Sequence, residues 1–147
     1  MPWRIGLSFN VSQIGRAAPA LLQSVFGCGT VRGRSDGVFY FEVTNPAQLE
    51  EAVFPFFEQY PLRTPKARDL AVFRRITALV RSGRHLTSQG FEEILSLRAP
   101  MNRGGKRRRG DDELVSTLRN WESSEAIRRA PSLKPADEDM VQLHSDM

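Results

Sequence analysis

Polar side chains, several of them basic, recur at two-residue spacing in two stretches of the chain, which would place them on one face of β-strands. These residues are Arg4, Ser8, Asn10, Ser12, Thr30, Arg32, Arg34, Tyr40 and Glu42. Arginine pairs well with guanine edges, asparagine with adenine, and serine or threonine with either, so such a face could read base pairs in a major groove. The simpler interpretation is the hydrated face that any antiparallel sheet can expose.

The charge of the chain is unevenly distributed along its length. Residues 1–110 carry 17 Lys and Arg against 8 Asp and Glu, a net charge of +9, whereas residues 111–147 carry 4 against 9, a net charge of −5, and together these give the +4 of the whole chain. A basic domain followed by an acidic extension is typical of modules that bind polyanions, although arginine-rich surfaces also arise without that function. Further basic residues could grip phosphates beside the polar face: Arg63, Lys66, Arg68, Arg103 and Lys106 to Arg109.

Length and cysteine content exclude several classes of protein. A chain of 147 residues can form one domain with a tail. The single cysteine, Cys28, argues against a disulfide framework and a four-ligand zinc site, and it favours a reducing compartment: the cytoplasm, or an organellar stroma or matrix. No apolar run approaches the ~20 residues that span a bilayer, so we expect no membrane partner.

Apolar residues predict the strands that would carry the polar face. Trp3, Ile5, Leu7, Phe9 and Val11 alternate with polar residues, which predicts a long half-buried strand. Residues 15–27 predict a short helix that ends at Gly27 and whose apolar side holds Leu21, Leu22, Val25 and Phe26. Residues 29–43 predict a β-hairpin around the turn Ser35-Asp36-Gly37.

The remainder reads as helices. Asn45-Pro46 is a cap and first helical residue, and Pro55 should kink or break the helix that follows. A long helix is expected over 64–83, and another after Thr87 that ends near Pro100. One weak helix is expected near 112–128 in an otherwise poorly packed tail. This order predicts an α+β fold, an antiparallel sheet with helices packed on one face.

Four segments together resemble the LAGLIDADG homing endonucleases, in particular the intron-encoded group. They are "FNVSQ" at 9–13, "LLQSVFGCGTVR" at 21–32, "FPFFEQYPLRTPKARDLAVF" at 54–73 and "RHLTSQGFEEILSLRAPMNRG" at 84–104. The resemblance covers about residues 3–104, which we expect to form a homing-endonuclease-like half-domain. Residues 105–147 would then be a basic linker and an acidic, largely disordered tail.

The resemblance implies a protein that lays a saddle of antiparallel strands into the major groove of double-stranded DNA. It implies two αββαββα halves, in one chain or in a dimer, and cleavage of both strands with Mg²⁺ bound to acidic residues. On the polar face it implies DNA contacts by Arg4, Ser8, Asn10, Ser12, Arg32 and Arg34, and it suggests a further basic contact from Arg16. The strand pattern adds Thr30, Tyr40 and Glu42 to the expected DNA-binding residues.

Two catalytic roles follow only from the resemblance. Gln13 matches a glutamine that ends the second strand near the reaction centre, and Lys66 matches a lysine that stabilises the charged phosphate. Taken without the resemblance, Gln13 could cap the next helix and Lys66 could be an exposed residue of a first helical turn.

The family's acidic helix and first strand have no counterpart before Trp3, so we expect an N-terminally truncated domain with no identifiable metal ligand. Three hypotheses follow. The first is an endonuclease fragment, from a mis-started reading frame, a decayed gene or a split enzyme that another chain completes. The second is a non-cutting DNA- or RNA-binding module, such as a maturase-like splicing factor acting on intron RNA, and the third is a protein-interaction fold.

Overall fold

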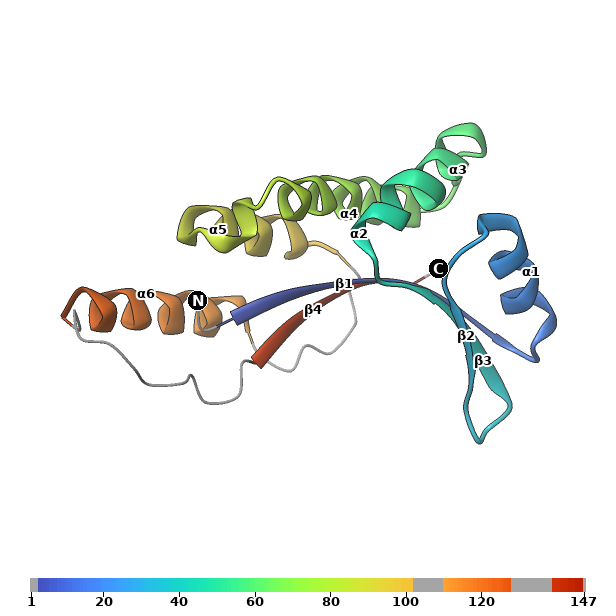
Figure 1. Ribbon diagram of the computed structural model, residues 1–147, viewed down its shortest axis with the longest axis horizontal. Helices are drawn as coiled ribbons and strands as arrows, with labels where there is room; N and C mark the ends of the chain where they lie inside the picture. Colours follow the sequence, from blue (N-terminus) through green and yellow to red (C-terminus); the bar gives the residue numbers. More distant parts are fainter. Residues whose placement is uncertain (1–2, 102–109, 128–138, 147) are drawn as a thin grey trace.

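The computed structural model describes residues 3–101, 110–127 and 139–146. These residues form two layers, a curved β-sheet and a layer of helices that covers one of its faces (Figure 1). The predicted α+β class is therefore confirmed. Among the described residues, no helix is long and apolar enough to cross a membrane.

The sheet has the strand order β2-β3-β1-β4. Its strands are β1 at Trp3–Ile14, β2 at Thr30–Gly33, β3 at Val38–Val43 and β4 at Asp139–Asp146. β1 pairs antiparallel with β3 from Phe9↔Val43 to Ile14↔Val38, and β3 pairs antiparallel with β2. These three strands form the antiparallel ribbon that the alternating residues predicted.

Strand β4 changes this sheet in a way that the sequence did not predict. It pairs with β1 in parallel, from Trp3↔Asp139 to Asn10↔Asp146. The sheet is therefore mixed. Among the described residues, β1 has a strand on both sides at Phe9 and Asn10, where the pairings with β3 and β4 overlap. The pairing joins segments far apart in the chain, so local periodicity carries little signal for it.

Helix α1, at Ala17–Phe26, lies beside the hairpin and ends at Gly27, whose φ of +67° is left-handed. Phe26 is buried, but Leu21 is 64% exposed and Val25 is 51% exposed. Both belong to the apolar side expected from the sequence, but α1 contacts the sheet along one narrow side that carries Phe26 and the partly buried Leu22.

Residues 46–59 form one continuous helical segment: α2 at Pro46–Gln48, the π-turn η1 at Leu49–Val53, and α3 at Phe54–Gln59. The Asn45 side chain caps it by accepting hydrogen bonds from Ala47 N (2.9 Å) and Gln48 N (3.3 Å). Of the kink or break expected at Pro55, the break is absent, since the helical segment continues past this residue to Gln59. Instead, the wider turn before it, in which Phe54 N–H bonds to Leu49 O, accommodates a ring that has no N–H to donate.

Two longer helices complete the upper layer, α4 at Lys66–Arg81 and α5 at Ser88–Arg98, joined by the 3₁₀ turn η2 at Arg84–Leu86. Thr87 caps α5 as predicted, since its Oγ1 accepts a hydrogen bond from Gly90 N at 3.1 Å. A Cβ at position 90 would overlap the carbonyl oxygen of Arg84, so this tight turn requires glycine.

The core between the layers is built from phenylalanine. Phe9, Phe41 and Phe73 are fully buried. The rings of Phe26 and Phe41 stack with centroids 5.6 Å apart, and Phe9 meets Phe41 edge-on at 6.4 Å. These contacts fix the apolar residues of β1 and β3 against the helices, so the alternate residues of both strands must point to the other face.

A second cluster packs helix α6, at Asp111–Ile127, onto the start of β1. Leu114 and Leu118 are buried against Trp3, Phe91 and Leu95. The predicted helix near 112–128 is thus confirmed, but the expectation of a poorly packed tail is wrong for α6 and for β4. Apolar residues at helical spacing give α6 a face that α5 and β1 cover. The proposed boundary after residue 104 falls among residues 102–109, outside the described residues.

We predict that Leu118→Ala lowers the free energy of unfolding by about 2–4 kcal/mol, because it removes a fully buried side chain from the cluster around Trp3. Thermal and urea unfolding followed by circular dichroism measure this loss. The matched control is Leu21→Ala, the same change at an exposed helical position, with an expected loss below about 0.5 kcal/mol. Equal losses in the two variants would contradict the packing of α6.

Candidate nucleic-acid interface

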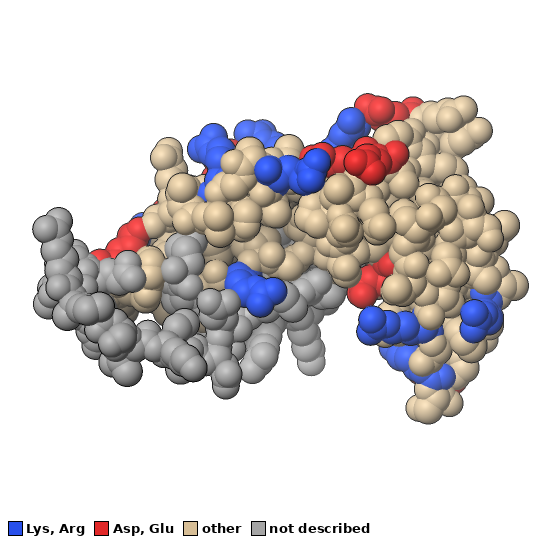
Figure 2. Space-filling model, in the orientation of Figure 1, with Lys and Arg blue, Asp and Glu red and all other residues tan. Residues whose placement is uncertain are grey.

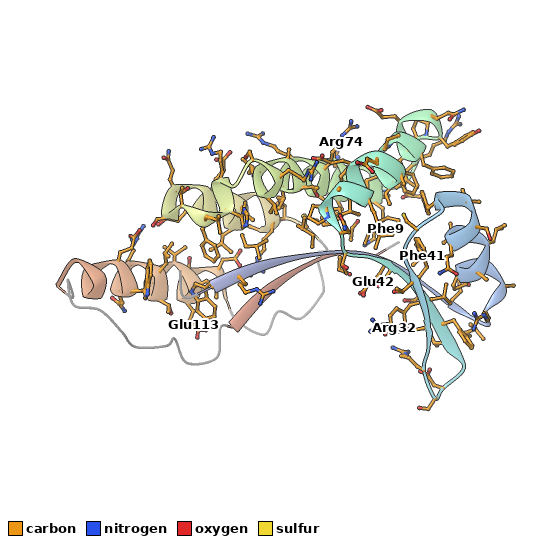
Figure 3. All side chains as sticks on the ribbon, in the orientation of Figure 1. Phe9, Arg32, Phe41, Glu42, Arg74 and Glu113 are labelled. Carbon is orange, nitrogen blue, oxygen red and sulfur yellow. The ribbon has the colours of Figure 1, made fainter. Side chains whose placement is uncertain are left out.

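The polar residues of the three antiparallel strands gather on the face of the sheet that the helices leave uncovered. In Figure 3, Arg32 and Glu42 lie on this side of the strands, whereas Phe9 and Phe41 lie on the helical side. We call this surface the open face and define it by the even-numbered residues of β1, β2 and β3, together with Arg34. The curvature of the ribbon makes the surface concave along the strands (Figure 1).

The register aligns these residues into two rows that cross the strands. Asn10 lies opposite Glu42, and Glu42 lies opposite Thr30, which forms one row. The second row is formed by Ser12, Tyr40 and Arg32. Directly paired residues point to the same face with Cβ atoms about 5 Å apart. Six of the predicted DNA-contacting residues are thereby brought together.

Ser8 belongs to this side of β1, but it is fully buried. Its hydroxyl donates a hydrogen bond to Glu42 Oε2 at 2.9 Å and accepts one from Asn10 Nδ2 at 2.6 Å. The prediction of Ser8 as a groove-facing contact is therefore corrected: Ser8 lies beneath its neighbours and fixes their side chains. Sequence periodicity placed it on the correct face, but could not show that it is buried there.

The tip of the hairpin is tied to the corner between β1 and α1. Gly15 N–H donates to Gly37 O at 3.1 Å, so Arg16, the residue before α1, lies beside the hairpin turn. Within the turn, Arg34 Nη2 donates to Asp36 Oδ2 at 2.8 Å. Asp36 Oδ1 also accepts from Val38 N at 3.2 Å. The guanidinium of Arg34 and the backbone bond together hold the pKa of the Asp36 carboxyl below its usual range.

Arginines on the two layers differ in their partners. On the helices, Arg74 pairs with Glu58 at 2.8 Å, and Arg81 pairs with Glu50 at 3.1 Å. On the sheet side, Arg4, Arg16 and Arg32 make no ion pair with any carboxylate of the described residues. Figure 2 shows the corresponding contrast, with blue and red mixed over the helices and blue gathered around the hairpin. The open face thus presents positive charge that described carboxylates leave largely uncompensated.

The two residues predicted to be catalytic lie on separate elements. Gln13 is exposed near the end of β1, opposite Phe39, and its odd position places it on the side of the strand that α1 borders. Lys66 begins α4 in the helical layer, and its Nζ lies 3.8 Å from Asp69 Oδ2. Their joint catalytic role stays a prediction.

Other predicted residues are placed as follows. Arg63 and Arg68 are exposed beside the start of α4. Arg103 and the run Lys106 to Arg109 lie outside the described residues. Within the described residues, no three His, Cys, Asp or Glu side chains come close enough to hold a metal ion.

One residue of the open face was missed. Ile14 extends β1 by a residue beyond the predicted strand, pairs with Val38, and is 87% exposed. Its even position places it on the same face as Ser12 and Asn10. The sequence pattern gave little signal for it, since polar Gln13 and apolar Ile14 reverse the alternation of residues 3–11, and the following Gly15 and Arg16 resemble the start of the next helix.

The chain is similar to known endonucleases over most of its length. The family model described as LAGLIDADG endonuclease matches residues 1–77. Two curated relatives from Neurospora crassa, probable intron-encoded endonucleases 2 and 3, are 32% and 29% identical over 106 residues, which are 69% of this chain. The match covers 24% and 20% of those two proteins, so the chain spans about a quarter or less of their length.

Solved structures show the same likeness. The homing endonuclease I-TnaI is 33% identical with a TM-score of 0.64, over 77% of this chain and 74% of that one. The meganuclease I-SmaMI, in a structure bound to uncleavable DNA, is 28% identical with a TM-score of 0.62, over 76% of this chain and 37% of that one. The archaeal intron-encoded endonuclease I-Vdi141I shares the fold, with a TM-score of 0.70 at 19% identity.

With more than half of its residues matched by the family model, this chain belongs to the LAGLIDADG endonuclease family. The resemblance inferred from the four sequence segments is thereby confirmed.

We predict that Arg34→Ala raises the pKa of Asp36 toward its ordinary value, because the Arg34 side chain is the largest cause of its depression. An NMR titration of the Asp36 side-chain carboxyl measures the shift. A lowered carboxyl pKa favours the folded protein above the unfolded-state pKa, and this contribution disappears as the pH falls through the folded-state pKa. Arg32→Ala is the control and should leave the pKa of Asp36 in place; an equal effect of both variants would contradict the assignment.

Proposed function

We propose that this chain is a DNA-binding domain of a LAGLIDADG-type homing endonuclease and that its open face enters the major groove of duplex DNA. One observation carries the proposal: two rows of hydrogen-bonding side chains on a concave ribbon whose arginines Arg4, Arg16 and Arg32 have no described carboxylate partner. Family membership and the DNA-bound structure of I-SmaMI support the same conclusion.

A B-form major groove is about 12 Å wide and admits a two-stranded β-ribbon, so adjacent strands of the open face can enter it. Successive rows on one face lie about 7 Å apart along the strands, so the two rows and Arg34 together extend over several base pairs. Arg32 and Thr30 offer donors to base edges from β2. Arg16 and Arg34, near the corner and the hairpin tip, suit phosphate contacts that set the register on the duplex.

Duplex DNA is preferred to intron RNA as the ligand for a geometric reason. The major groove of A-form RNA is deep and narrow, and side chains on a β-ribbon cannot reach its base edges. A maturase-like role would instead need single-stranded or looped RNA, for which stacking aromatic residues are typical. Tyr40 is the aromatic residue on the two rows of the open face.

Cleavage is proposed for a larger assembly. The curated relatives are about four to five times as long as the matched part of this chain, which supports a second half-domain or partner chain that completes the site. Gln13 and Lys66 are the proposed catalytic residues of this half, and magnesium is the metal that the family implies. Within that assembly, we assign DNA binding and positioning to the open face of this chain. A reducing compartment, either the cytoplasm or an organellar matrix or stroma, suits the single cysteine.

Filter binding of the full chain to duplex DNA over a salt series tests the proposal. With about six phosphate contacts, affinity should fall by about 10³ between 50 and 200 mM salt. The double variant Arg32→Ala/Arg34→Ala should weaken binding at least about tenfold and flatten the dependence on salt. An affinity that does not change with salt concentration, or that is higher for hairpin RNA than for duplex DNA, would refute this function.

The matched control removes two arginines from the helical layer. Arg75 and Arg81 are exposed on α4, and both lie near glutamates of the same layer. Arg75→Ala/Arg81→Ala changes the net charge by the same amount but leaves the open face intact. We expect its affinity to stay within about threefold of the original protein, since distant charges are screened beyond about 10 Å at 0.1 M salt. An equal loss in both double variants would show that net charge alone, rather than the open face, binds DNA.

A further inference from the structure

Glu42 is an unusual residue for a surface that binds DNA. It lies at the centre of the open face, on β3, with Asn10 on one side and Thr30 on the other. Figure 3 shows it on the same side of the strands as Arg32, away from the helices. A carboxylate at this place repels phosphates and lowers affinity for every DNA sequence. Its presence therefore needs a compensating role.

The structure holds this carboxylate in one orientation. Ser8, fully buried, donates its only hydroxyl proton to Glu42 Oε2 at 2.9 Å. The hydroxyl oxygen accepts from Asn10 Nδ2 at 2.6 Å, which directs the Ser8 proton toward Glu42. A side chain whose rotamer is fixed by a buried neighbour loses little entropy when it makes a further hydrogen bond.

The other carboxylate oxygen remains available. Among the described residues, no Lys or Arg lies within ion-pair distance of Glu42, and Oε1 accepts no hydrogen bond. Glu42 is half-buried, so this acceptor is partly shielded from water and still accessible from the open face. A partly desolvated carboxylate oxygen of this kind favours a ligand that presents an N–H donor.

Base edges differ in what they offer to such an acceptor. In the major groove, cytosine presents the N4 amino donor, guanine presents two acceptors, and thymine presents an acceptor and a methyl group. Adenine presents its N6 amino group beside the N7 acceptor, which a carboxylate repels. Cytosine is thus the base that fits an ionised carboxylate best.

We propose that Glu42 is a specificity-determining residue that selects cytosine at one position of the DNA site, and that Ser8 is the positioning residue that orients it. This inference rests on the proposed function of the open face. In this row, we expect Glu42 rather than Asn10 to contact the base, because Asn10 already donates one amide hydrogen to Ser8.

Selection of bound duplexes from a randomised library, followed by sequencing, tests this role with the full chain. The original protein should enrich cytosine at one position. Glu42→Gln should reduce that preference at least about tenfold and shift it toward adenine, which a glutamine amide recognises through N6 and N7. Preferences at the other positions should persist, since the remaining contacts are unchanged.

Two further variants separate reading from folding. Ser8→Ala keeps the carboxylate but removes its hydrogen-bond donor, so it should weaken the preference for cytosine at the same position and at no other. Glu51→Gln removes one exposed carboxylate from the helical layer and should leave the whole profile unchanged. Circular dichroism melting of each variant verifies that the domain is folded.

The outcomes distinguish the two proposals. If the original protein binds duplex DNA, but its base preferences are the same as those of Glu42→Gln, the role of Glu42 is wrong and groove binding stands. The role of Glu42 is also wrong if Glu42→Gln weakens the base preference at every position of the DNA site equally. If the original protein does not bind duplex DNA, the proposed function itself is wrong, and the role of Glu42 fails with it.

Discussion

Burial of one side of β1 is the constraint on which the rest of the molecule depends. Leu7 and Phe9 pack into the core beneath the helices, and Phe9 meets Phe26 and Phe41 edge-on. Since side chains alternate strictly along a strand, this burial decides which residues of β1 face away from the helices. Through the pairing of β1 with β3, it also decides that Tyr40 and Glu42 point to this face. Through the pairing of β3 with β2, it does the same for Thr30 and Arg32. A slip of one residue would turn the polar rows into the core.

Structural features that depend on short stretches of sequence were predicted correctly. The alternation of residues 3–11, the turn Ser35-Asp36-Gly37 and the caps at Asn45 and Thr87 each depend on near neighbours, and the structure contains all of them. Family membership followed from four segments in order. The catalytic roles of Gln13 and Lys66 have no comparable support, because they depend on how distant elements meet.

The errors share a physical origin in contacts made at long range. Leu21 and Val25 look apolar enough to be buried, but α1 has too little sheet beneath it to cover them. The parallel pairing of β4 joins the two ends of the described chain, and no local pattern reports it. Pro55 has no N–H to donate inside a helix, but the π-turn before it allows the helical segment to continue. Ser8 was assigned to the correct face of β1 but was expected to be exposed, whereas it is buried.

The separation of faces has a consequence for how such a protein could change over generations. Most open-face side chains contribute little to folding, because exposed substitutions usually alter stability by less than about 0.5 kcal/mol. Residues such as Ser12 or Arg32 can therefore be exchanged one at a time while the phenylalanine core preserves the fold. Ser8, Asn10 and Glu42 are joined by hydrogen bonds, and the effects of substitutions at contacting residues are not independent. New recognition would arise by single steps at the edges of the surface, whereas its centre would have to be replaced as a set.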